Sequence, residues 1–326
     1  MKRFIALIFG SLLTCTAQAE PVAVTSRPIS SFYRIGFGST FGPFEWRGGL
    51  VLTSDNRHFG GLSGLSLNHS CKDMLAVSDR GHWLKARLAY NGDGALVSIS
   101  DGEIAPIRNE AGKPYAYKKQ SDAEALSPLG KGRYLVAFEQ QERVGLFDIG
   151  SKGLNAPFKL LRSPKMISEA PKNGEMESIG RLSKGRYGDF NIAISEKYRD
   201  SRGDTYGWLW KGSKTIPFTV AQHDDYAITD LAILPDGNVL ILERSFSKGS
   251  LPGMAIRRFA PSKIEPWGRI EPDLLFEGRV PIYAIDNMEG MAVCTRDGEI
   301  RVTIVSDDNF SPPLQSTLLL QFAYRP

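Results

Sequence analysis

Residues 287–307 read NMEGMAVCTRDGEIRVTIVSD, and this stretch contains the pattern that decides the fold. A short run of small and aliphatic residues carries an acid, Glu289, near its start. A turn containing Gly298 follows, and a second apolar run from Val302 ends in another acid, Asp307. Short apolar runs bounded by turn residues are typical of buried β-strands. The stretch therefore predicts two antiparallel strands that bring both acids to the same end of the pair.

The same pattern occurs five times along the chain. The aligned residues, at successive intervals of 61, 53, 53 and 59 residues, are Ser63, Glu124, Glu177, Asp230 and Glu289. The acids that end the second strands are Asp79, Glu139, Glu196, Glu243 and Asp307. Each repeat leaves room for two further strands, and radial repeats of four antiparallel strands are typical of propellers. We therefore predict an all-β propeller of five four-stranded blades.

The last repeat ends one strand short, so the ring needs a closing strand from elsewhere in the chain. Residues 49–53 directly precede the first repeat and are predicted to complete the final blade. Cys71 and Cys294 lie in the first and last repeats, which are neighbours in a closed ring of five. They form either a disulfide that fixes the closure or two buried free thiols. A sixth blade assembled from residues 21–58 stays open as an alternative.

The N-terminal residues predict export. A basic start precedes an apolar run from Phe4 to Ala17, and small residues then mark a cleavage site, which together are typical of a signal peptide over residues 1–19. A lipoprotein leader modified at Cys15 is the alternative. Removal of the leader leaves residues 20–326 as one predicted domain in the periplasm or outside the cell. No later run approaches the roughly 20 apolar residues of a membrane span, so we expect no integral membrane contact.

Charge and composition exclude several classes of function. The formal net charge is +4 and no long run of Lys and Arg occurs, which argues against a nucleic-acid partner. Two cysteines beyond the leader are too few for a multi-thiol zinc site. The four histidines include no pair at the i, i+4 spacing typical of zinc ligands.

The repeated acids predict a central site. Residues at equivalent positions of successive blades converge on the propeller axis, and so many carboxylates cannot all stay ionised without cations or bound protons. Calcium accepts many oxygen ligands in flexible geometry and suits such a site. The predicted metal ligands are Glu124, Glu177, Asp230, Glu289 and Asp307. Alternatively, the acids have a structural role and bond backbone amides of neighbouring blades or pair with arginines.

Basic residues near these acids could bind an anionic substrate. The arginines that lie close to them in sequence are Arg80, Arg143, Arg181 and Arg244. A metal-assisted hydrolase needs a cation, a carboxylate to take a proton and cationic groups for the substrate. The residues assigned to catalysis are Glu124, Glu177, Asp79, Arg80 and Arg244. Ser63 is not a candidate nucleophile, because its surroundings differ from the G-x-S-x-G elbow.

Several motifs, in order along the chain, resemble a known family. They are GGLSGL at 60–65, SDRG at 78–81, DAEAL at 122–126, LER at 242–244, DNMEGM at 286–291 and SDDNFS at 306–311. This set is similar to the phytase-like family, labelled "esterase-like activity of phytase". The resemblance implies a bacterial exported propeller that hydrolyses phosphoric or carboxylic esters. Well-understood propeller phytases use calcium ions and basic residues around phosphate.

The sequence leaves three functions open. The first is a calcium-assisted hydrolase of phosphate or other esters that acts on a small anionic or ester substrate. The second is a non-catalytic propeller that binds a protein, a glycan or a small ligand. The third is a hydrolase of the lactonase type. Fold alone cannot choose among them, because function depends on the site.

Overall fold

The computed structural model describes residues 19–165, 176–246, 251–311 and 314–326. The predicted leader, residues 1–19, lies outside this part of the chain except for Ala19. Within the described residues, no helix is long and apolar enough to cross a membrane. Two short helices are present, α1 (Lys118–Ser121) and α2 (Ile149–Lys152).

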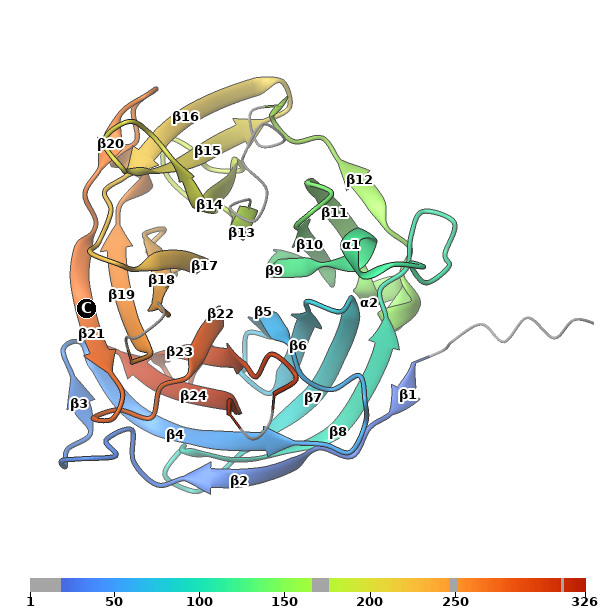
Figure 1. Ribbon diagram of the computed structural model, residues 1–326, viewed down its shortest axis with the longest axis vertical. Coiled ribbons are helices and arrows are strands. Elements are labelled where there is room, and N and C mark those ends of the chain that lie inside the picture. Colours follow the sequence, from blue (N-terminus) through green and yellow to red (C-terminus); the bar gives the residue numbers. More distant parts are fainter. Residues whose placement is uncertain (1–18, 166–175, 247–250, 312–313) are drawn as a thin grey trace, which may run out of the picture.

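The described strands form five antiparallel blades around a central axis (Figure 1). The innermost strands are β5 (Leu62–Leu67), β9 (Ala123–Gly130), β13 (Met176–Arg181), β17 (Ala227–Ile233) and β22 (Asn287–Arg296). The second strands are β6 (Asp73–Ser78), β10 (Arg133–Phe138), β14 (Asn191–Arg199), β18 (Val239–Ser245) and β23 (Glu299–Asp307). The prediction of a five-bladed propeller is therefore confirmed.

Each blade continues outward with two further strands. The third strands are β7 (His82–Tyr90), β11 (Arg143–Asp148), β15 (Thr205–Lys211), β19 (Gly253–Phe259) and β24 (Thr317–Tyr324). The fourth strands are β8 (Leu96–Pro106), β12 (Lys159–Leu161), β16 (Lys214–Val220), β21 (Asp273–Arg279) and β4 (Phe44–Thr53). The two-residue strands β20 (Arg269–Ile270) and β3 (Thr40–Phe41) pair with β16 and β4.

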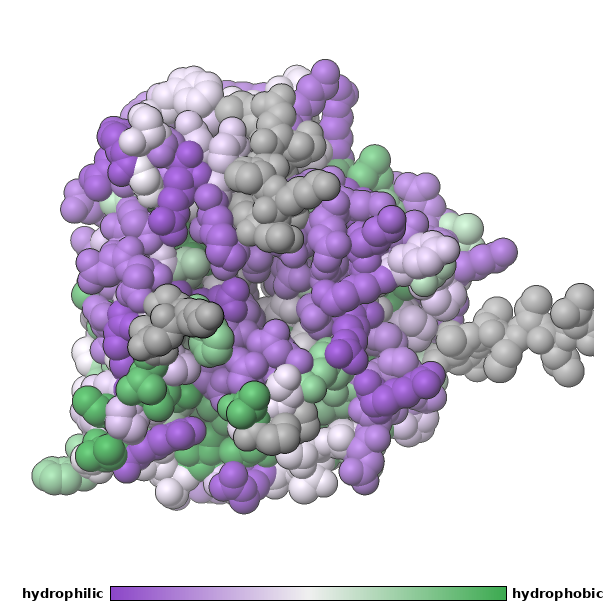
Figure 2. Space-filling model, viewed as in Figure 1, coloured by the Kyte–Doolittle hydropathy of each residue, from purple (hydrophilic) through white to green (hydrophobic). Residues whose placement is uncertain are grey.

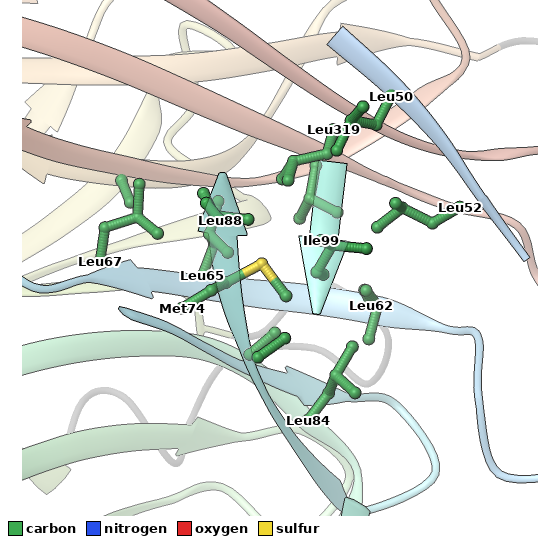
Figure 3. Packing of buried hydrophobic residues seen from close by; sticks show 14 of the residues in the cluster. Leu50, Leu52, Leu62, Leu65, Leu67, Met74, Leu84, Leu88, Ile99 and Leu319 are labelled. Carbon is green, nitrogen blue, oxygen red and sulfur yellow. The ribbon is translucent and has the colours of Figure 1, made fainter. Parts of the chain in front are cut away.

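The hydrophobic core is divided among the five interfaces between neighbouring blades. In the interface drawn in Figure 3, Leu65 and Leu88 of the first blade pack near Leu50 and Leu319 of the last blade. Both faces of a blade are therefore buried, which explains why the second strands read as continuous apolar runs rather than as alternating ones. Burial of one such leucine contributes about 2 kcal/mol.

The N-terminal segment closes the ring, as predicted. Strand β4 pairs antiparallel with β24, with Val51 opposite Leu318. Strand β2 (Thr25–Ile29) extends the same blade, whereas β1 (Glu20–Pro21) pairs with β8 at the outer edge of the first blade. Residues 21–58 thus supply strands to existing blades, and the alternative of a sixth blade is wrong.

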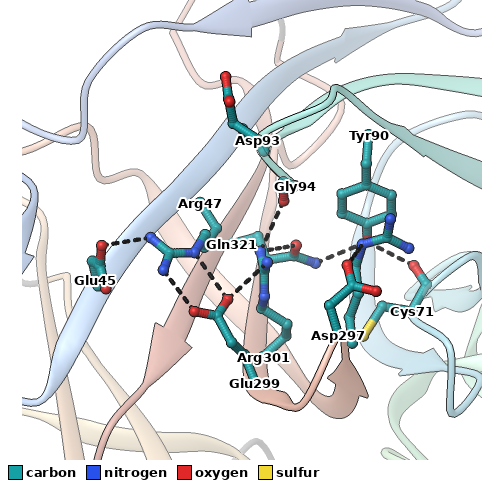
Figure 4. Close-up of polar contacts among 12 residues, drawn as sticks. Glu45, Arg47, Cys71, Tyr90, Asp93, Gly94, Asp297, Glu299, Arg301 and Gln321 are labelled. Carbon is teal, nitrogen blue, oxygen red and sulfur yellow. Dashed lines mark hydrogen bonds and ion pairs between the residues drawn. The ribbon is translucent and has the colours of Figure 1, made fainter.

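Covalent and polar contacts strengthen this closure. A disulfide joins Cys71 to Cys294 with a Cα–Cα distance of 5.5 Å. Figure 4 shows the polar contacts beside it, where the Gln321 amide donates to the Tyr90 hydroxyl, which donates to the Cys71 carbonyl oxygen. Arg301, which is buried, donates to the backbone oxygen of Gly94 at 3.0 Å. A disulfide and hydrogen bonds therefore join the first blade to the last, in addition to the N-terminal strand that completes the last blade.

Candidate functional site

Each innermost strand carries a β-bulge near its start, and the bulged residues surround the axis. The register between first and second strands shifts by one residue at each bulge, which leaves one residue unpaired. The bulged residues are Ser63, Glu124, Glu177, Thr229 and Glu289. A bulge re-aims its side chain away from the sheet's regular alternation. The repeated acid therefore lies where the chain has an extra residue to turn toward the mouth of the channel.

The fourth blade differs from the sequence alignment by one residue. Thr229, not Asp230, is the bulged residue of β17, because Ile228 pairs with Glu243 and Asp230 pairs with Leu242. The second strand shows the same offset. Glu243 pairs with the residue directly before the bulge, as Ser78 does in the first blade, so the next residue, Arg244, corresponds to Asp79. The predicted equivalence of Asp230 with the other ring acids is wrong, because the sequence alignment matched acids whereas strand register follows the buried apolar residues.

Asp230 and Glu243 instead have partners of their own. The two carboxylate oxygens of Asp230 accept hydrogen bonds from the backbone N–H groups of Leu231 at 2.8 Å and Met291 at 2.6 Å. Met291 lies on β22, so Asp230 links the fourth blade to the fifth. Glu243 is buried against Arg257, whose guanidinium contacts both of its oxygens. These contacts match the structural role that the sequence left open for such acids.

One side of the ring is neutralised by an arginine, and we call it the Arg244 side. The Arg244 guanidinium lies 2.6 Å from Glu289 and 3.1 Å from Glu196, and it also donates to Asn287. The Asn287 amide donates to Glu289 at 2.8 Å. Burial raises the pKa of Glu289 to about 7, although Arg244 opposes this shift. Two carboxylates on this side therefore share the partly buried guanidinium of Arg244, and Glu196 also contacts the Lys197 ammonium.

The other side, which we call the Glu124 side, contains a cluster of three acids. Asp122, Glu124 and Glu139 each place an oxygen within 4.8 Å of the others. Burial raises the pKa of Glu124 well above its usual value, and the nearby carboxylate of Glu177 raises it further. Glu177 is only 7% exposed, and neither Glu124 nor Glu177 has an ion pair or hydrogen bond to any described residue. Two buried carboxyl groups of the ring, those of Glu124 and Glu177, therefore have no direct counter-ion among the described residues.

The Glu124 side fits a hard divalent cation. Two oxygens that bind one Ca²⁺ from opposite sides, each at about 2.4 Å, lie at most about 4.8 Å apart. The oxygens of Asp122, Glu124 and Glu139 satisfy this limit. The cluster contains oxygen donors and neither histidine nor cysteine, so it favours Ca²⁺ or Mg²⁺ over zinc.

A lysine lies between the first two blades at the edge of this cluster. The Lys118 ammonium, at the start of α1, lies 2.6 Å from Asp122 and 3.1 Å from Asp79. Burial raises the pKa of Asp79, and Lys118 lowers it in part. Asp307 completes the ring toward the last blade, where burial and the charge of Glu289 raise its pKa to about 8.

Glycines make room for these acids. Gly61 has a φ of +61°, and a Cβ there would lie 2.1 Å from Oδ1 of Asp79. Its N–H donates to Asp308 at 3.0 Å. Gly60 and Gly61 of the GGLSGL motif therefore shape the acidic mouth, and any side chain at Gly61 would displace Asp79.

The four arginines occupy different environments. Arg80 is exposed and stacks on Phe310, with 3.3 Å from the guanidinium carbon to the ring centroid, and it has no ion pair to any described residue. Arg143 stacks on Phe138 and donates to the backbone oxygen of Gln120, so it is part of the packing. Arg181 ends β13 opposite Asn191, four residues beyond Glu177 or roughly 13 Å along the strand. Arg181 therefore lies away from the ring acids and pairs with Asp189 at 3.8 Å.

An open pocket of about 510 Å³ adjoins the Arg244 side. Glu196 and Arg244 form its inner part, and Lys197, Arg199 and the half-exposed ring of Phe246 form the remainder of its described lining with Asp225 and Ala227. Figure 2 shows that hydrophilic residues surround the centre of the face that carries α1. A ligand of moderate size would find both positive and apolar contacts here, next to the ring.

Sequence reasoning missed three residues of the site: Asp122, Lys118 and Thr229. Asp122 and Lys118 lie in the connection before β9, outside the repeated strand pattern. The DAEAL motif contained a usable signal, since Asp122 stands two residues before the repeated acid. The error at Thr229 was detectable from Ile228, which corresponds to Met176 and Met288, the apolar residues directly before the bulges.

The fold, the ring and the glycine-lined mouth agree with the comparison to known families. A family model described as "Phytase-like: Esterase-like activity of phytase" matches residues 57–310, which is most of the chain and includes all five bulges. A search of curated proteins gave no match. The chain therefore belongs to the phytase-like family.

Proposed function

We propose that this protein is an exported, calcium-assisted hydrolase of phosphate or other esters, acting at the Glu124 side of the ring. The observation that supports this most strongly is the cluster of Asp122, Glu124 and Glu139, whose oxygens lie within 4.8 Å of one another beside the unpaired Glu177. Membership of a family named for esterase-like activity supports the choice of a hydrolase. The sequence of the leader supports export.

In this proposal each residue has a defined task. Asp122, Glu124 and Glu139 hold the cation, which when bound polarises the ester oxygen and acidifies a water molecule. Glu177 is buried beside Glu124 and is the candidate to accept the proton of the attacking water. Arg80 has an exposed guanidinium and is the candidate to bind an anionic group of the substrate.

The open pocket beside Arg244 is the candidate site for the rest of the substrate. Lys197 and Arg199 present exposed positive charge, and Phe246 is 57% exposed and can contact an apolar or ring-bearing group. Arg244 itself is engaged by Glu196 and Glu289, so its role is to hold the ring acids in place.

A binding propeller is the second candidate, and exposed apolar side chains on the connections of this face favour it. Phe246 and Leu251 flank the β18–β19 connection, and Leu314 in the β23–β24 connection is 87% exposed. Apolar groups at the rim of a polar mouth are typical of surfaces that contact a partner. A lactonase-type hydrolase would use the same cation site on a different ester.

One set of measurements separates these candidates. The purified protein is analysed for bound metal, melted with and without EDTA, and assayed with calcium on aryl phosphates, aryl carboxylic esters and lactones. The proposal predicts bound calcium, a lower melting temperature in EDTA, and ester hydrolysis that E124Q abolishes and E103Q retains. Glu103 is an exposed residue of β8 paired with Lys85, so E103Q is the matched control.

The outcomes of this set differ for each candidate. Turnover of lactones without turnover of acyclic esters would select the lactonase. Calcium binding without turnover of any substrate, or no calcium binding at all, would contradict the proposed hydrolase and favour the binding propeller.

A further inference from the structure

Lys118 occupies a position that a bound cation would contest. Its ammonium lies 2.6 Å from Oδ1 of Asp122, which is 1% exposed and belongs to the candidate cation cluster. Burial lowers the pKa of Lys118, but the hydrogen bond to Asp122 and the charge of Asp79 raise it overall, so the side chain is a full positive charge. In the absence of metal, Lys118 is therefore a counter-ion of the Glu124 side.

Both oxygens of Asp122 already have partners. Lys118 contacts Oδ1, and the Gln140 amide donates to Oδ2. A cation that binds Asp122 must replace one of these contacts. The ammonium is the partner that it would displace, because like charges at this separation repel strongly in a buried site, whereas an amide dipole does not carry a net charge.

A second acceptor is available to the displaced ammonium. Lys118 already lies 3.1 Å from Oδ2 of Asp79, and Oδ1 of Asp79 is buried without a hydrogen-bond partner among the described residues. This Oδ1 lies against Gly61, where a Cβ would be only 2.1 Å from it. The structure thus provides a buried acceptor that becomes useful when Lys118 leaves Asp122.

The backbone of α1 is held in place during such an exchange. Ser121, at the end of this helix, packs so closely on Gly81 that a Cβ at Gly81 would lie 2.3 Å from the Ser121 Cβ. Movement of Lys118 between Asp122 and Asp79 therefore needs only side-chain rotation. The side chain is half exposed, which leaves room for it.

We propose that Lys118 is a tethered counter-ion that binds Asp122 in the metal-free protein and is displaced onto Asp79 when a divalent cation binds. This inference rests on the proposed cation site and adds its regulation. Lys118 keeps the metal-free cluster partly neutralised and lowers the affinity of the site for the cation, so that binding is reversible.

Calcium titration of the whole protein tests this exchange. The protein is freed of metal with EDTA, dialysed, and titrated calorimetrically with CaCl₂ as wild type, K118M, K118Q, K118R and K119M. Removal of the charge in K118M and K118Q is expected to tighten calcium binding at least tenfold. K118R keeps the charge and is expected to stay within about threefold of wild type. Lys119 has no ion pair to a described residue, so K119M is expected to bind as wild type does.

A second readout uses stability alone. Without calcium, K118M is expected to melt at a lower temperature than wild type, because Asp79 and Asp122 lose their counter-ion. In saturating calcium the difference is expected to shrink, since the cation then replaces the ammonium at Asp122.

Three results would contradict this inference, and each has a different consequence. Equal or weaker calcium binding by K118M and K118Q, with calcium bound by wild type, would overturn the exchange and leave the proposed function standing. If K118R bound calcium as tightly as K118M, the charge of Lys118 could not be what weakens calcium binding in wild type. This result would also overturn the exchange. Absence of calcium binding in every variant would remove both this inference and the proposed hydrolase.

Discussion

The Arg244 side and the Glu124 side of the ring are built from the same bulged strands, yet they balance charge in different ways. Glu289 and Glu196 share the partly buried guanidinium of Arg244. Neither Glu124 nor Glu177 has an ion pair to a described residue, and burial raises the pKa of both. The charge of Glu177 adds to the shift at Glu124, whereas those of Glu196 and Glu289 add to the shift at Glu177 and Arg244 opposes it. The fourth blade creates this difference, because it supplies Thr229 where three other blades supply a glutamate, and Arg244 where the other four supply an acid. One side is thus held together by its own ion pairs, and the other is the side at which we propose that a cation binds.

The largest effect is expected from removal of the Arg244 guanidinium. R244M would leave Glu289 buried without its cation and Glu196 with Lys197 alone, and removal of one partner of a buried ion pair costs about 3–5 kcal/mol. The free energy of unfolding from urea titration measures this loss. R181M, at the far end of β13, is the matched control and is expected to change little. A loss below about 1 kcal/mol for R244M would show that the two sides do not differ as described.

The next effect concerns the stabilisation that calcium gives when it binds at the Glu124 side. A ligand at 100 times its dissociation constant stabilises the folded state by about 2.7 kcal/mol. We expect calcium to stabilise wild type by this amount, and E124Q to lose the stabilisation. E289Q, on the Arg244 side, is expected to retain most of it. Thermal melting with and without calcium measures both, and equal losses in the two variants would contradict a cation site confined to the Glu124 side.

A smaller effect is expected at Asp230, which the sequence placed in the ring. D230A would leave the N–H groups of Leu231 and Met291 unpaired, and each buried unsatisfied group costs about 1–3 kcal/mol. We expect lower stability in urea with unchanged calcium affinity. The control is D273A, because Asp273 is an exposed residue of the same blade. Loss of calcium binding in D230A at full folding would restore Asp230 as a ligand.

The smallest effect is expected from the protonation of Asp307, on the last blade. Burial first, and then the charge of Glu289, raise the pKa of Asp307 from 3.8 to about 8. The folded state therefore keeps a proton that the unfolded chain loses, so this stability is complete below pH 3.8 and is lost as pH rises to about 8.

The measurement is the fall in melting temperature between pH 5 and pH 8 without calcium. D307N stays neutral at every pH, so its fall is expected to be smaller than that of wild type. D297N changes an exposed residue and is expected to follow wild type. An equal fall in D307N and wild type would show that Asp307 is ionised throughout.

Much of the fold was predictable, because a propeller repeats one pattern and the repeats reinforce one another. The five strand pairs, the closing strand at residues 49–53 and the adjacency of Cys71 and Cys294 all followed from repeat spacing. Of the two alternatives for the cysteines, a disulfide or free thiols, the structure shows the disulfide. Export and calcium stay predictions.

The site was harder to predict, because the positions of acids in the sequence do not show how neighbouring strands pair. An alignment that matches acids places Asp230 in the ring, but the pairing of β17 depends on which apolar side chains are buried. Asp122 and Lys118 were missed since they belong to a connection, and connections do not repeat. Similarly, Arg244 was predicted to bind substrate, but a one-residue difference in register places it among the acids.

The closing strands also determine when the molecule can finish folding. Strand β4 precedes all five repeats in the chain, and its partner β24 follows the strand pair of the last one. Until β24 emerges, β4 has an unpaired edge, and unpaired edges are sites of aggregation. A break in the chain near Tyr324 would therefore remove more than one strand, since it would leave the start of the molecule without its partner. The ring therefore cannot close until the strand that follows the fifth repeat has been made.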